Sequence, residues 1–190
     1  MPQLHITGDA AADELLSSSP LALLIGMLLD QQVPMETAFA GPAKIRERLG
    51  AFDAATIAGT DPQRLAEVFQ QTPAVHRFPG SMAERTQALC AALVAEWGGD
   101  AERLWTDGDP DGATVLKRLK ALPGFGDQKA KIFVALLGKQ YGLTAPGWES
   151  AAGSYGEAGS HRSVADIVDA SSLTKVREFK KAAKAAAKGN

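Results

Sequence analysis

An all-α fold is predicted by three features of the 190-residue sequence. Helix starts recur, because Ser19–Pro20, Asp61–Pro62 and Asp109–Pro110 each place a capping side chain before a proline at the first helical position. No segment alternates between apolar and polar residues for long enough to form a strand. Apolar residues make up 45% of the chain and the net charge is −2, values that exclude disorder as a description of the whole protein.

The expected helices follow one another along the chain. The residues after Ser19–Pro20, LALLIGMLLDQQ, are apolar on nearly every face and predict a buried central helix. Ser81 and Glu84 have the spacing of a capping box. Two Pro- and Gly-containing stretches, residues 72–80 and 142–161, are expected to be loops with a functional or mobile character. The other expected helices span residues 36–49, 62–69, 81–97, 110–121, 127–141 and 173–188.

Several classes of protein are excluded by composition. The single cysteine, Cys90, rules out a disulfide framework, a Cys-rich zinc site and an iron–sulfur cluster held by the chain's own thiolates. The longest apolar run, residues 21–29, is too short to span a bilayer, and the N-terminus lacks the features of a secretory signal. We therefore expect a cytoplasmic protein, monomeric and without a membrane partner.

Charge is distributed unevenly along the chain. The segment 175–190 holds six basic residues and one acidic residue, a net charge of +5, so the rest of the chain carries −7. A basic tail on an acidic body is typical of a protein with an anionic partner. A solvated C-terminal helix is the alternative interpretation.

A helical hairpin is predicted over residues 113–140, where two amphipathic stretches are joined by Leu122-Pro123-Gly124-Phe125-Gly126. The second helix begins immediately, so its first N–H groups and its positive dipole end point out of the turn. Such a helix start is suited to binding phosphate, and the hairpin would grip a nucleic-acid backbone without reading bases. An ordinary αα-turn is the alternative. The residues expected to contact DNA here are Gly124, Phe125, Gly126, Asp127, Lys129 and Lys131, with Lys117 and Lys120 nearby.

Three motifs resemble those of the HhH-GPD base-excision DNA glycosylases, the superfamily of endonuclease III and 3-methyladenine DNA glycosylase, and their order along the chain also agrees with that family. They are the LPGFG hairpin, the stretch LLIGMLLDQQ at residues 23–32, and PGSMAER at residues 79–85. The resemblance implies a two-lobed all-α fold with a cleft for double-stranded DNA between the lobes. It assigns residues 20–141, including the hairpin 113–140, to a helical barrel lobe, and residues 1–19 together with 142–190 to the second lobe.

The sequence departs from the family pattern in ways that bear on chemistry. Bifunctional members carry a lysine nucleophile two residues after the second hairpin glycine, where this chain has Gln128, so we expect no efficient strand cleavage. Lys129 is adjacent, and one step along a helix is expected to turn it about 100° away. The family's four cluster cysteines are absent, so no iron–sulfur cluster is expected. The catalytic aspartate is also missing, because the loop after the second hairpin helix leads to Trp148 and Glu149.

The resemblance therefore implies a monofunctional DNA glycosylase that flips a damaged base, with an alkylated purine as first guess, and hydrolyses its N-glycosidic bond. Glu149 is the predicted catalytic carboxylate, supporting positive charge on the sugar. The alternative interpretation makes Glu149 the first-turn acid of the next helix. Asp30 and Glu36 are further acids that can face the cleft, unless they serve as a cap and a surface charge.

Other residues receive roles from the same resemblance. Gln32 is expected to fill the gap left by the flipped nucleotide, or else to be a helix-end amide. Trp148 is expected to line the base pocket, or else to be a core tryptophan. The main-chain carbonyls of Leu122 and Phe125 are expected to be able to hold K⁺ or Na⁺, with no other cofactor. Arg77 and Arg85 are expected to meet phosphates or else to be solvated, whereas the three histidines are too scattered to form a metal site. A non-catalytic DNA-binding protein of the same fold, recognising damaged or distorted DNA, remains the alternative function.

Overall fold

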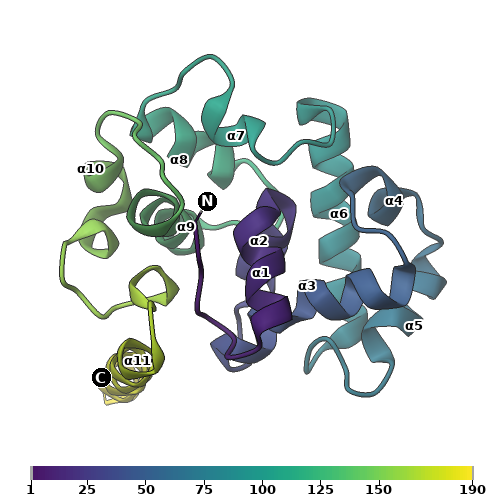
Figure 1. Cartoon of the computed structure of the whole chain (residues 1–190), viewed down its shortest axis with the longest axis horizontal. Coiled ribbons are helices and arrows are strands. Elements are labelled where there is room, and N and C mark those ends of the chain that lie inside the picture. The colour runs from purple at the N-terminus through teal and green to yellow at the C-terminus, as the bar shows by residue number, and fades with distance from the viewer. Residues whose placement is uncertain (1, 190) are drawn as a thin grey trace.

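Helix α2 (Pro20–Leu29) lies at the centre of the molecule, with the other helices around it (Figure 1). In this computed structural model, which describes residues 2–189, every residue from Leu21 to Leu29 is buried. The Ser19 hydroxyl accepts a hydrogen bond from the Ala22 N–H at 3.1 Å, and Pro20 occupies the first turn. The predicted buried central helix is therefore confirmed together with its start.

One group of helices packs on one side of α2. Helix α3 lies against α2, and both α4 and α5 pack on the long helix α6 (Figure 1). The Asp61–Pro62 start of α5 is confirmed, because the Asp61 carboxylate accepts from the Gln63 N–H at 3.1 Å. The bounds are α3 (Met35–Leu49), α4 (Ala54–Gly59), α5 (Pro62–Gln70) and α6 (Pro79–Trp97).

The second group is built on α9, which packs against α8, α10 and both 3-10 turns, and also touches α2. Helix α1 lies over α2 and α3, while α11 stands at the edge of the molecule. The bounds are α1 (Ala10–Ser18), α7 (Arg103–Thr106), α8 (Gly112–Lys120), α9 (Asp127–Gln140), α10 (Trp148–Ala152), η1 (Gly153–Gly156), η2 (Val164–Asp166) and α11 (Ala170–Lys188).

The N-terminal segment lies against the start of α11. His5 and Ile6 from the N-terminal segment and Val168 and Leu173 from the start of α11 line one shallow hollow. The resemblance assigns both segments to the second lobe, whereas α10 and the 3-10 turns pack directly on the hairpin helices. The division into two lobes at residue 141 stays a prediction.

The all-α prediction is confirmed, since residues 2–189 contain helices and no strand. Two predicted helix starts are wrong. Helix α6 begins at Pro79, where proline's missing N–H costs nothing, so Ser81 lies inside the helix and makes no capping box. Helix α8 begins at Gly112, because the carboxylate of Asp111, and not that of Asp109, accepts from the Thr114 N–H at 2.8 Å.

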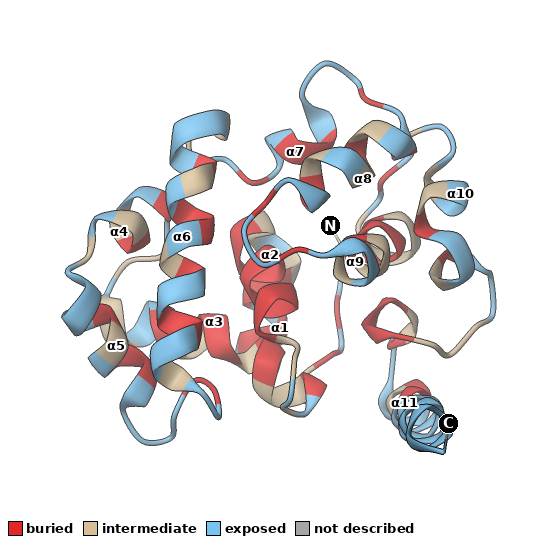
Figure 2. Ribbon diagram, turned by 180° about the vertical axis from the view of Figure 1, so that it is seen from behind, coloured by how far each residue is buried: buried red, intermediate tan, exposed pale blue. Residues whose placement is uncertain are grey.

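Burial follows the helix faces, with a continuous red interior through α2, α3 and the inner faces of α6 and α9 (Figure 2). Helix α11 differs, because it is exposed along most of its length. Within residues 2–189, no single helix is long and apolar enough to cross a membrane. Helices α1 and α2 would reach that length only together, and they meet at a bend of 115°.

Candidate active site and DNA interface

The predicted hairpin is formed by α8, α9 and the turn between them. Leu122 and Phe125 are buried, and Phe125 packs edge-on against Phe133 of α9 with ring centroids 6.2 Å apart. Gly124 has a φ of +82°, and a methyl group there would overlap the Leu28 side chain. Glycine is needed at this position for both reasons, and its absent side chain lets the turn sit against the end of α2.

The outer surface of the turn is available to a ligand. Gly124 and Gly126 are exposed, and their N–H groups have no acceptor among residues 2–189. The Asp127 carboxylate accepts from Lys120 Nζ at 3.1 Å and from Lys131 Nζ at 2.8 Å. These two lysines hold the pKa of Asp127 below its usual range. The hairpin therefore presents N–H groups that can donate to an anion, next to two lysines that can interact with the same anion.

A cleft of about 740 Å³ opens where the end of α2, the first turn of α9 and α11 come together. Four basic side chains and one carboxylate, that of Asp30, face it. The apolar part of its lining contains no aromatic side chain among the described residues. Its lining residues are Met27, Asp30, Gln31, Gln32, Val33, Pro34, Arg77, Gln128, Lys129, Ile132, Lys180 and Lys184.

Asp30 is the carboxylate of the cleft. It caps the C-terminus of α2, and its side chain is 6% exposed. Its ion pair with Lys180 Nζ is long, at 3.9 Å, and no hydrogen bond to the carboxylate is found within residues 2–189. Burial raises the pKa of Asp30, an effect opposed by the charges of Lys180 and Lys129. A buried carboxylate with unfilled acceptor positions and a perturbed pKa, facing a cleft, is typical of a catalytic group.

Lys129 is turned into the cleft, so the expectation that the helix turns it away is wrong. Its Nζ donates to the Leu28 main-chain oxygen at 2.8 Å. Burial lowers the pKa of Lys129 to about 8, and the nearby Asp30 carboxylate works against that shift. Gln128 also lines the cleft, and its amide donates to the Tyr155 hydroxyl at 2.9 Å. The first turn of α9 thus presents both an amide and an amine.

His76 holds the corner that carries Asp30 and the two glutamines, a role that the sequence did not indicate. Its Nε2 lies 3.1 Å from the Leu29 oxygen and 2.9 Å from the Gln31 oxygen, so it must donate. Its Nδ1 accepts from the Phe78 N–H at 3.0 Å, which requires the neutral ring. Burial lowers the pKa of His76, in keeping with that state.

Gln32 lies on a ridge between two hollows. It is exposed and has a φ of +58°, a strained backbone for a residue with a side chain. On one side is the cleft, and on the other is a smaller hollow lined by Phe78, Ser81 and Arg85. The ridge position is compatible with the predicted gap-filling role, which stays a prediction.

Trp148 and Glu149 lie elsewhere, and neither lines the cleft. The Trp148 ring covers Gly138, and the Trp148 backbone lies against Gly112. Gly138 is ten residues after Gln128, which places the ring about 15 Å along α9 from the cleft. Glu149 is an exposed residue in the first turn of α10. The geometry matches the alternative interpretations, a packing tryptophan and a first-turn acid.

Glu36, the other acid named from the sequence, is engaged with α11, because one of its oxygens pairs with Arg177 at 2.5 Å. Its second oxygen is buried without a partner in the described chain. The carbonyls expected to hold K⁺ or Na⁺ belong to the buried Leu122 and Phe125. The Leu122 oxygen already accepts from the Phe125 N–H at 3.2 Å, so an ion there would use its second lone pair. The cation site stays a prediction.

Comparison with protein families gives one finding. The family model described as HhH-GPD superfamily base excision DNA repair protein matches residues 25–187, a range that contains the end of α2, the hairpin and nearly all of α11. The chain therefore belongs to the HhH-GPD superfamily of base excision DNA repair proteins, and its partner is DNA. Neither a comparison with curated proteins nor one with solved structures gave a match.

Proposed function

We propose that this protein is a monofunctional DNA glycosylase in which Asp30, and not Glu149, is the catalytic carboxylate. The observation that carries the proposal is the Asp30 carboxylate itself, 6% exposed, without a hydrogen bond in residues 2–189 and open to the cleft beside the hairpin. A sugar cation placed in this cleft would meet a negative charge that the protein has already dehydrated.

The reaction follows from these groups. The bond between C1′ and the base nitrogen breaks, and the base leaves with the electron pair while positive charge develops on the sugar. Ionised Asp30 stabilises that charge and accepts a proton from the water that attacks C1′. The departing base nitrogen takes up a proton from the Lys129 ammonium, which lines the same cleft and interacts with the Asp30 charge. The products are the free base and an abasic site.

The side chain of Gln128 cannot form an imine, which supports an enzyme that leaves the strand intact. The position of Lys129 favours a second candidate function, strand cleavage at the abasic site. Its neutral amine would add to C1′ of the ring-opened sugar and expel water, giving an iminium ion. The Asp30 carboxylate would then accept a C2′ proton, and the C3′–O bond would break so that the 3′ phosphate leaves with the electron pair. Because the pKa of Lys129 is about 8, the ammonium form dominates at neutral pH.

An alkylated purine remains the proposed lesion, and the charges of the cleft restrict which alkylated purines fit. Arg77, Lys129, Lys180 and Lys184 all face the cleft, against the single carboxylate of Asp30. A base that carries a positive charge would be repelled by these cations. We therefore propose a neutral adduct, such as a purine with an added etheno ring, in preference to the cationic 7-methylguanine.

A panel of duplexes with single lesions tests the proposal. Base release without strand cleavage, revealed as breaks only after hot alkali, is the expected result. Borohydride trapping of the wild-type protein and its loss in Lys129→Gln would instead establish the second candidate. If no lesion is released while all duplexes are bound, the protein is a non-catalytic DNA-binding member of the superfamily.

A further inference from the structure

Helix α11 is the most exposed element of the molecule. From residue 177 to residue 189 every residue is exposed, although the helix continues to Lys188 (Figure 2). Alanine and lysine, which dominate this part, are strong helix formers, so the helix persists without packing. Val176 in the first turns anchors α11 to the core, whereas the part of the helix after it has no buried face and is available to a partner.

Four of the six basic residues of α11 form one row along the helix. Arg177, Lys180, Lys184 and Lys188 are spaced by three, four and four residues, which places them in one row along the helix. We call these four residues the basic row. Lys180 and Lys184 line the cleft, so the middle of the row borders the candidate active site. Lys175 lies on the opposite face by the same helical geometry.

The row is directed toward the cleft by two ion pairs. Arg177 pairs with Glu36 of α3 at 2.5 Å, and Lys180 lies 3.9 Å from Asp30 at the end of α2. Lys184 and Lys188 have no ion-pair partner among residues 2–189. Like charges four residues apart repel one another, so the outer half of the row is unfavourable until an anion joins it.

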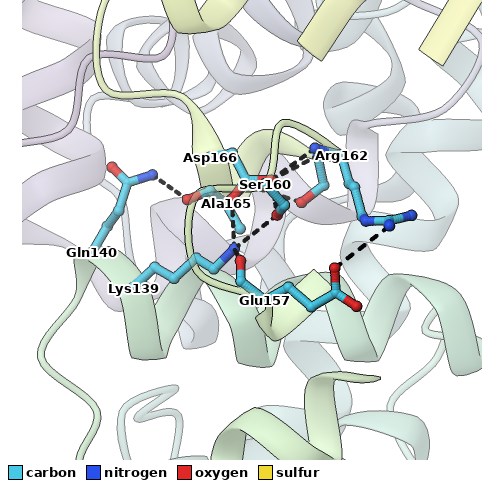
Figure 3. A network of polar contacts seen from close by, with 8 residues as sticks. Lys139, Gln140, Glu157, Ser160, Arg162, Ala165 and Asp166 are labelled. Carbon is cyan, nitrogen blue, oxygen red and sulfur yellow. Dashed lines mark hydrogen bonds and ion pairs between the residues drawn. The ribbon is translucent and has the colours of Figure 1, made fainter. Parts of the chain in front are cut away.

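The start of α11 is fixed to α9 by a polar network (Figure 3). The Asp166 carboxylate, 4% exposed, accepts from Lys139 Nζ at 2.5 Å, from the Ser160 hydroxyl at 3.1 Å and from the Arg162 N–H at 2.8 Å. Three residues later Asp169 and Ser172 cap α11 reciprocally. Lys139 belongs to α9, which is the second helix of the hairpin. The start of α11 is therefore fixed relative to the hairpin.

We propose that α11 is the second DNA-binding wall of the cleft, with its basic row on the phosphates of a strand, while the hairpin binds from the other side. From Lys180 to Lys188 the helix rises by about 12 Å. Along that distance one strand of a duplex offers about three to four phosphates, enough for each lysine of the row. The inference rests on the proposed entry of DNA into the cleft, and it assigns an affinity role to α11 that is separate from the chemistry at Asp30.

The test compares two variants of equal charge. Lys184→Gln/Lys188→Gln removes two members of the row that do not touch Asp30, whereas Lys175→Gln/Arg64→Gln removes two exposed charges that lie elsewhere. Binding to an undamaged duplex is measured over a series of salt concentrations. Losing two phosphate contacts should make the negative slope of log K, the logarithm of the binding constant, against log salt less steep by about 1.8. It should also weaken binding by about 10- to 100-fold at low salt. The control variant should keep the wild-type slope.

Acetylation of lysines, followed by mass spectrometry, gives a second readout. Duplex DNA should protect Lys184 and Lys188 in the wild-type protein and leave Lys175 reactive. Equal slopes for the two variants, or no protection of the row, would overturn the proposal. A row that instead binds vesicles of anionic lipid, with an unchanged DNA slope, would overturn it as well. Base release by the wild-type protein on the lesion panel decides the proposed function separately.

Discussion

Asp30→Asn isolates the charge of the proposed catalytic carboxylate. The substitution keeps the size of the side chain and, since no hydrogen bond to the Asp30 carboxylate is found in residues 2–189, it breaks none there. Removing a buried charge also removes its dehydration cost, so the variant should unfold at the same temperature as the wild-type protein or at a higher one. A loss of base release would therefore come from lost chemistry and not from a damaged fold.

The size of that loss can be worked out from the geometry. Lys180 Nζ lies 3.9 Å from the Asp30 carboxylate, which shows how closely a positive charge can approach it. At about 4 Å and an effective dielectric constant of about 20, two unit charges attract by about 4 kcal/mol. The sugar cation in the transition state carries most of one charge, so Asp30→Asn should slow base release by about 10² to 10³-fold.

The assay is single-turnover base release from saturating lesion-containing duplex, with thermal unfolding as the check on folding. Glu149→Gln is the matched control, because it also replaces a carboxylate by an amide and lies outside the cleft lining. Its rate should stay within about twofold of wild type. If Asp30→Asn retains the wild-type rate and Glu149→Gln loses it, the assignment to Asp30 is refuted and the expectation from sequence is restored.

Three further predictions concern the pH profile, the hairpin and the packing of Trp148. Base release should rise with pH as Asp30, whose pKa is raised by burial, ionises, and it should fall near pH 8 as the Lys129 ammonium is lost. Single-turnover rates for Lys129→Gln should lack that alkaline fall. Gly126→Asp places a carboxylate in open space at the phosphate-binding turn and should lower the affinity for all duplexes about equally in a binding titration. Gly126→Ala should leave the affinity unchanged. Gly138→Ala forces a methyl group into the Trp148 ring and should lower the free energy of unfolding by about 1–3 kcal/mol, while Gly59→Ala, which points into open space, should not.

The fold was accessible from sequence because its signals are local. Ser19 and Asp61 cap helices where the chain places them before proline, and the unbroken apolar run after Ser19 could only be buried. The incorrect starts at Ser81 and Asp109 arose where two capping patterns competed within a few residues. In each case the sequence could not tell which residue would be inside the helix, because the neighbouring chain decides it, as when Gly112 N–H bonds to Pro146.

The site was less accessible, because it depends on which helix ends meet. Asp30 and Lys129 are 99 positions apart, and Lys180 comes from a third element. Counting along one loop led to Glu149, whereas the carboxylate that faces the cleft belongs to the opposite end of the chain. The direction of Lys129 also differs from the prediction. A turn of about 100° per residue separates it from Gln128, but the cleft is wide enough to receive both side chains.

Asp30 breaks local rules for stability in two ways, and this supports a functional reason for its presence. A carboxylate is unfavourable at the C-terminus of a helix, where the dipole is negative, and also unfavourable when buried without hydrogen bonds. Lys129 and Lys180, each opposing the raised pKa of Asp30, provide only partial compensation. An asparagine there would fold at lower cost. Asparagine could replace Asp30 without loss of packing, so the carboxylate is expected only where its negative charge is needed. Such a charge is needed when positive charge forms on a sugar.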